Sequence, residues 1–93
     1  MMPSPWFVYI LECENERLYT GITTDVARRY REHVTGAGAA FTRMNKPHRI
    51  LAFTPCADRS EASRLEARIK RLPPADKRAL GASWSGGART DPS

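Results

Sequence analysis

Four side chains that could act on a phosphodiester fall within residues 7–33, namely Tyr9, Tyr19, Arg29 and His33. Phosphodiester hydrolysis needs an attacking water, stabilisation of the negative charge on the phosphoryl oxygens, and help for the leaving oxygen. A tyrosine can orient the water, or deprotonate it once the phenol pKa of about 10 is lowered. An arginine can bind two phosphoryl oxygens at once. These residue types therefore suit phosphoryl chemistry, provided that the fold brings them together.

Two predicted strands and one predicted helix carry these residues. Trp6–Leu11 is apolar on both alternating faces, which is typical of a central strand buried on both sides. A short polar turn, Glu12–Arg17, separates it from the β-rich segment Leu18–Ile22, in which Gly21 leaves room for a close approach. Asp25–Val34 then has helical spacing and carries the arginine and the histidine one turn apart.

A Gly/Ala-rich stretch ends this helix, and a basic loop over Phe41–His48 is predicted to follow. Its Arg43, Lys46 and His48 could follow a phosphate backbone, while Phe41 could stack on a base. Alternatively, Phe41 anchors the loop to the core and the charges are only solvated. The sequence leaves both interpretations open.

The second half of the chain begins with a predicted strand over Arg49–Thr54, followed by the strongest predicted helix, Asp58–Leu72. Glu66 lies beside the apolar stripe of this helix, where a carboxylate is costly unless a cation compensates it. It is therefore a candidate ligand for one Mg²⁺ (or Mn²⁺) ion with mostly water ligands. The alternative is an ordinary ion pair with Lys70, four residues further on.

The last predicted element is a short helix over Ala75–Leu80 that starts on Pro74. Gly81–Ser93 is small and polar, and Trp84 is its one large apolar residue. We therefore predict a single domain over residues 6–80 and a disordered tail over residues 81–93.

The order and spacing of these residues resemble the GIY-YIG nuclease superfamily. Its two signature triplets correspond to Phe7-Val8-Tyr9 and Tyr19-Thr20-Gly21. Its helical arginine and histidine fall on Arg29 and His33, and its acidic residue falls on Glu66. The likeness covers nearly the whole predicted domain and is closest to the small single-domain bacterial branch of the superfamily.

The resemblance implies an α/β fold with a small three-stranded sheet, mixed antiparallel and parallel, flanked by helices in the order β-β-α-β-α with a possible short last helix. It also implies a metal-dependent endonuclease that acts on DNA. Tyr19 would deprotonate or orient the water, and Tyr9 and His33 would hold the hydrogen-bond network around it. Arg29 would stabilise the pentavalent phosphorus, and Glu66 would hold the metal ion.

The overall composition agrees with a nucleic-acid partner. The 93 residues have a formal net charge of +5, which favours a polyanion, although many small proteins are basic for no specific reason. Two cysteines, Cys13 and Cys56, and the lack of a signal peptide or membrane-length apolar run favour a cytoplasmic location without membrane attachment.

Two other functions compete with the endonuclease. One is a non-cleaving module that binds single-stranded DNA or RNA, and the other is a protein-interaction module. A partner protein could also supply target specificity, because the predicted domain leaves little chain for a second one.

Overall fold

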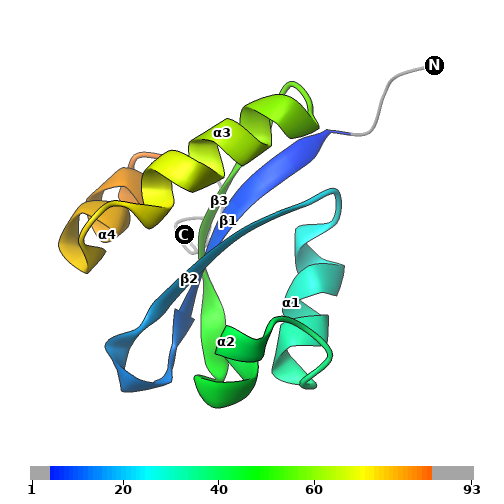
Figure 1. Cartoon of the computed structure of the whole chain (residues 1–93), viewed down its shortest axis with the longest axis vertical. Helices are drawn as coiled ribbons and strands as arrows, with labels where there is room; N and C mark the ends of the chain where they lie inside the picture. Colours follow the sequence, from blue (N-terminus) through cyan, green and yellow to red (C-terminus); the bar gives the residue numbers. More distant parts are fainter. Residues whose placement is uncertain (1–4, 85–93) are drawn as a thin grey trace, which may run out of the picture.

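The computed structural model describes residues 5–84, which fold into a three-stranded sheet with helices on both sides (Figure 1). The elements in chain order are β1 (Trp6–Cys13), the 3₁₀ turn η1 (Glu14–Glu16), β2 (Leu18–Thr23), α1 (Val26–Val34), α2 (Ala40–Met44), β3 (Pro47–Cys56), α3 (Arg59–Lys70) and α4 (Pro74–Ala82).

The sheet has the strand order β2-β1-β3, and β1 pairs antiparallel with both neighbours. The predicted α/β fold with a small three-stranded sheet is confirmed, but the predicted mixture of antiparallel and parallel pairing is wrong. The reason is topological: β2 and β3 do run in the same direction, but β1 lies between them, so no parallel pair forms within the described residues.

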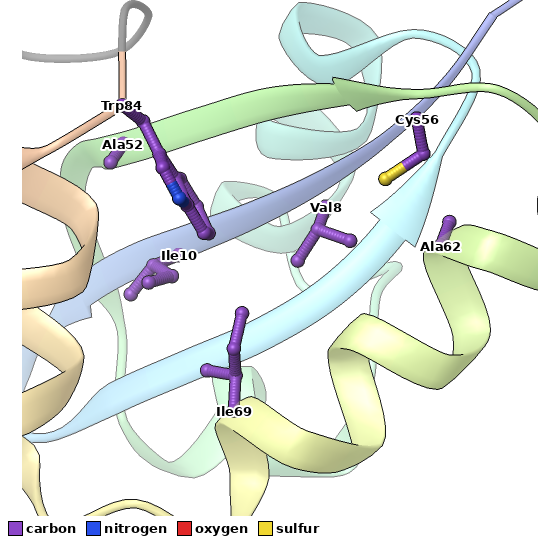
Figure 2. Packing of buried hydrophobic residues seen from close by; sticks show 7 residues of the cluster. All are labelled: Val8, Ile10, Ala52, Cys56, Ala62, Ile69 and Trp84. Atoms are coloured by element: carbon purple, nitrogen blue, oxygen red, sulfur yellow. The ribbon is translucent and has the colours of Figure 1, made fainter.

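Alternate side chains of β1 are buried in two different cores, as the apolar character of both its faces predicts. Val8 and Ile10 face α3 and α4, where they pack with Ala62 and Ile69 (Figure 2). Tyr9 and the other odd-numbered residues of the strand face the opposite side, which α1 and α2 cover. Burial of each large apolar side chain stabilises the fold by about 1.5–3 kcal/mol. The strand that carries Tyr9 is thereby fixed from both sides.

The hairpin turn is shorter than predicted, because β1 continues to Cys13 and only η1 and Arg17 separate it from β2. Asn15 and Glu16 have φ values of 62° and 57°. Asn tolerates this left-handed region better than most residues do, which is consistent with a turn at this point.

The predicted loop over Phe41–His48 is wrong, because α2 occupies its first half and β3 already begins at Pro47. A helix of five residues is too short to give a periodic signal in the sequence. Its stability comes from tertiary contacts. Thr42 is buried, and Phe41 packs against the same face of the sheet as α1. α2 is thereby held close to α1.

The α3 and α4 helices begin as the sequence predicts. The Asp58 carboxylate caps α3 by accepting a hydrogen bond from the Glu61 N–H at 2.8 Å, and α4 starts on Pro74. The described helices include none long and apolar enough to cross a membrane.

The predicted start of the tail at Gly81 is wrong for its first four residues. Helix α4 runs to Ala82, and Trp84 is only 9% exposed because its indole lies in the α3–α4 core near Ala52 and Ile10 (Figure 2). A single large aromatic side chain is enough to hold a polar segment against a core. The rest of the predicted tail, residues 85–93, lies outside the described residues.

Candidate active site

The centre of the candidate site is Tyr9, whose side chain is 2% exposed. Its hydroxyl oxygen lies 2.8 Å from Nε2 of His33 on α1. Gly21 is its direct partner on β2, and a Cβ atom at Gly21 would lie 2.5 Å from the Tyr9 hydroxyl. The side chain of Tyr9 therefore lies over Gly21 on β2, and only a glycine at this position leaves room for it.

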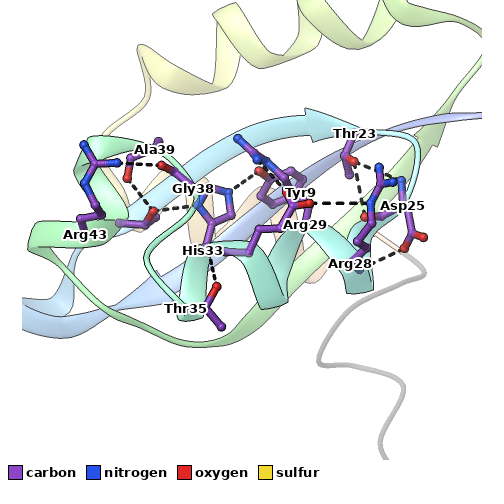
Figure 3. A network of polar contacts seen from close by, with 12 residues as sticks. Tyr9, Thr23, Asp25, Arg28, Arg29, His33, Thr35, Gly38, Ala39 and Arg43 are labelled. Atoms are coloured by element: carbon purple, nitrogen blue, oxygen red, sulfur yellow. Dashed lines mark hydrogen bonds and ion pairs between the residues drawn. The ribbon is translucent and has the colours of Figure 1, made fainter.

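His33 is the buried link between β1, α1 and α2 (Figure 3). It is 1% exposed, and its Nδ1 atom lies 2.7 Å from the Thr42 hydroxyl oxygen. Burial, followed by the positive charge of Arg29, lowers the pKa of His33 below its usual value near 6.5. The imidazole is therefore neutral at physiological pH.

Tyr19 completes an aromatic group on the same face. Its ring centroid lies 4.9 Å from that of His33, 6.3 Å from that of Tyr9 and 5.7 Å from that of Phe41. The Tyr19 hydroxyl makes no hydrogen bond to the protein within residues 5–84, so it can bind water or substrate. Phe41 is half-buried against this ring, which favours its interpretation as an anchor over that as a base-stacking residue.

Arg29 lies at the border between this group and solvent. Its Nη1 atom donates to Glu32 Oε1 at 2.8 Å, its side chain is 34% exposed, and its guanidinium contacts the Tyr9 hydroxyl. Burial raises the pKa of Tyr9 above the usual phenol value, and the contact with Arg29 only partly opposes that rise. The neighbouring Arg28 is 57% exposed and lies 4.0 Å from Glu32, so it belongs to the solvated side of α1.

Glu66 lies on α3, on the other side of the sheet from His33. Its carboxylate is 22% exposed and pairs with Lys70 Nζ at 3.2 Å, as the alternative interpretation predicts. Its negative charge nevertheless adds a small contribution to the raised pKa of Tyr9.

The donor set limits the kind of metal ion that these residues could hold. No group of three or more His, Cys, Asp or Glu side chains that could enclose a metal ion occurs in residues 5–84. A partly exposed single carboxylate suits Mg²⁺, which commonly binds one or two carboxylates and takes water and substrate phosphate as its other ligands.

Arg43 and Lys46 lie next to the site. Both line a pocket of about 310 Å³ that reaches His33 and Thr42, and Arg43 Nη1 donates to the Gly38 carbonyl at 3.0 Å. Both side chains are exposed. A larger groove of about 620 Å³ lies elsewhere, between α3 and the end of β3, and none of the predicted site residues lines it.

The sequence analysis missed three residues that support the site. Thr42 contacts His33, Glu32 holds Arg29, and Gly38 leaves room for the imidazole, since a Cβ atom there would overlap Nδ1. The spacing of Arg29 and Glu32 on one helix is a usable signal for an ion pair. Thr42 and Gly38 give no such signal, because their contacts depend on how α2 packs.

A family model, two relatives and one solved structure each match most of this chain. The model of the GIY-YIG catalytic domain matches residues 5–78. A UPF0213 protein of Cupriavidus necator is 51% identical over 77 residues, covering 83% of this chain and 84% of that protein. A UPF0213 protein of Vibrio cholerae is 48% identical over 85 residues, covering 90% and 84%. The solution NMR structure of a UPF0213 protein from Bacillus halodurans is 41% identical and matches with a TM-score of 0.54, covering 91% of this chain and 89% of that one.

Proposed function

Because this chain belongs to the GIY-YIG family, we propose that it is a metal-dependent endonuclease that hydrolyses phosphodiester bonds in DNA. The observation that carries the proposal is the convergence of the buried pair Tyr9 and His33 with the partly exposed Arg29, although the three come from two different elements. A permanently charged, partly exposed guanidinium beside such a hydrogen-bonded pair suits the binding of a phosphoryl group.

Arg29 would bind the phosphoryl group. Its guanidinium is permanently charged, and Glu32 holds it on one side while the other side stays accessible. A donor that is already oriented towards developing negative charge stabilises the transition state more than the ground state. The ion pair with Glu32 therefore serves orientation, and its own contribution to stability is small because it is partly exposed.

The two tyrosines would have different tasks. The Tyr19 hydroxyl has no hydrogen-bond partner among residues 5–84, so it would bind and orient the attacking water, or take its proton. Tyr9 has a raised pKa because of burial, so it remains protonated at physiological pH and would act through its hydrogen bond to His33, next to the Arg29 guanidinium. This division agrees with the roles that the family resemblance implies.

Glu66 would hold a single Mg²⁺ (or Mn²⁺) ion. When bound, such an ion acts as a Lewis acid that stabilises negative charge on the phosphoryl and leaving oxygens. Lys70 neutralises the carboxylate in the absence of an ion.

DNA would approach the basic border of this site, where Arg43 and Lys46 can contact backbone phosphates. Such contacts carry no sequence information, so target choice would come from DNA shape or from a partner protein. We expect the protein to act in the cytoplasm.

The ion pair between Glu66 and Lys70 favours a second candidate, a module that binds single-stranded DNA or RNA without cleaving it. If Lys70 occupies the carboxylate permanently, the basic surface remains but no metal ion binds.

The experiment that separates the two is a panel of fluorescent single-stranded, duplex, flap and branched DNA substrates incubated with Mg²⁺, Mn²⁺ or EDTA. The proposal predicts cleavage of at least one substrate with a divalent ion and none with EDTA. Salt-sensitive binding without cleavage of any substrate would favour the second candidate.

A further inference from the structure

The buried contact between Thr42 and His33 is the feature of the site that neither the family resemblance nor the comparisons assign. Thr42 is 1% exposed and lies on α2. Its hydroxyl oxygen is 2.7 Å from His33 Nδ1 and also donates to the Ala39 carbonyl at 2.9 Å, one helical turn back. A threonine hydroxyl has one proton, so a hydroxyl that donates to Ala39 must accept from His33.

The hydrogen-bond network distinguishes the two neutral tautomers of His33. If Nδ1 carries the proton, it donates to Thr42, and Nε2 accepts the proton of the Tyr9 hydroxyl at 2.8 Å. Every proton in the chain from Tyr9 through His33 and Thr42 to Ala39 then has an acceptor.

The other tautomer leaves one proton without a partner. With the proton on Nε2, His33 would donate to the Tyr9 oxygen, and Arg29, which has donors only, contacts the same oxygen. The proton of the buried Tyr9 hydroxyl would then have no acceptor within residues 5–84. A buried donor without an acceptor is the more expensive arrangement.

We propose that Thr42 is a positioning residue whose hydroxyl holds His33 in the Nδ1–H tautomer, so that Nε2 accepts the proton of Tyr9. The Tyr9 oxygen then presents only lone pairs to Arg29 and to a bound water. Thr42 thereby acts on the reacting groups through His33 without contacting substrate. This inference rests on the proposed function for its catalytic consequence, but the tautomer itself is a property of the protein without substrate.

The test is ¹⁵N NMR of the imidazole groups in the full chain, labelled at histidine and recorded at pH 8. We expect His33 to show a protonated Nδ1 and an unprotonated Nε2, whereas the exposed His48 should show the averaged signals of mixed tautomers. A protonated Nε2 in wild-type protein would overturn the proposal, whatever the variants do. Because this measurement needs no DNA, a wild type that cleaves nothing would contradict the proposed function and leave the tautomer result standing.

Two substitutions add a test of cause. Thr42→Val keeps the shape of the side chain but removes the hydroxyl, and it should shift the His33 signals towards mixed tautomers and lower kcat about tenfold or more. Thr42→Ser keeps the hydroxyl, and it should restore both the wild-type NMR signals and most of the rate. If Thr42→Val keeps the wild-type tautomer signals while folded, or if Thr42→Ser fails to restore them, Thr42 does not set the tautomer. A Thr42→Val protein that does not fold leaves the wild-type spectrum and Thr42→Ser to decide.

Discussion

Gly21 gives the sharpest single test of how the site is built, because its effect follows from one distance. A Cβ atom at Gly21 would lie 2.5 Å from the Tyr9 hydroxyl oxygen, whereas ordinary contacts of a Cβ atom begin near 3.4 Å. In Gly21→Ala the hydroxyl must therefore move away by about 0.9 Å. Tyr9 is almost fully buried, so this movement comes at the expense of its 2.8 Å contact with His33.

Two magnitudes follow for Gly21→Ala. Loss of a buried hydrogen bond costs about 1–3 kcal/mol of stability. A misplacement of catalytic groups by about 1 Å can cost on the order of a hundredfold in rate. We therefore expect a folded but less stable protein with a rate of DNA cleavage roughly a hundredfold below that of wild type, measured by urea denaturation and by initial rates on the best substrate.

Gly36→Ala is the matched control. Gly36 has a φ of 90°, so alanine there costs about 1–2 kcal/mol of backbone strain, but no atom lies within 4 Å of the added methyl group. The two variants should lose similar stability, and only Gly21→Ala should lose activity. Wild-type rates in a folded Gly21→Ala protein, or an equal loss of rate in both variants, would refute this explanation of the Tyr9–His33 contact.

Two further predictions concern stability. Trp84→Ala should lower the free energy of unfolding by about 3–5 kcal/mol, because it removes a large aromatic side chain from the α3–α4 core; a loss below about 1 kcal/mol in urea denaturation would contradict this placement of the indole. Stability should also fall as the pH drops below about 6.5, because the folded-state pKa of His33 is lowered and the unfolded chain takes up the proton first. Urea midpoints at pH 7.5 and 5.5 should therefore differ more for wild type than for His33→Gln, and an equal difference would contradict the prediction.

The parts of the fold that the sequence predicts well are those with a long repeating pattern. β1 is apolar on both faces from Trp6 to Leu11, and α3 has twelve residues with a clear apolar stripe and an acidic N-cap. A long pattern of apolar and polar residues shows which face of an element is buried, and the period of the pattern identifies the element as a strand or a helix. The strand that positions Tyr9 and the helix that carries Glu66 were therefore predictable.

The parts that could not be predicted depend on tertiary contacts. Helix α2 is five residues long, and the side chains that hold it, Phe41 and Thr42, read as loop residues until α1 and the sheet are in place. Trp84 follows a segment of small residues, and only its packing under α3 and α4 shows that the fold continues to this position. The antiparallel pairing of β3 likewise depends on whether it joins the free edge of β1 or that of β2 once the hairpin has formed.

The candidate site also contains residues that the sequence predicts and residues that only the structure reveals. The residue types and spacing single out Tyr9, Arg29 and His33, and the structure brings these three together. Of the partners that orient them, Glu32 can be inferred from its i,i+3 spacing to Arg29, whereas Thr42 becomes visible only when the distances are known. The contact between Thr42 and His33 joins two elements, and a single sequence records Thr42 only as an isolated polar residue.

The central claim, that Arg29 stabilises a phosphoryl group during cleavage, is tested most directly by comparing two neighbouring arginines. The measurement is the initial rate of DNA cleavage at saturating Mg²⁺ for Arg29→Ala and for Arg28→Ala, with circular dichroism to show that both are folded. Arg29→Ala should be slower than wild type by a factor on the order of a hundred or more, as expected for the loss of an oriented donor. Arg28→Ala removes the same charge from a side chain that is 57% exposed and should stay close to wild type. Equal rates for the two folded variants would contradict the account.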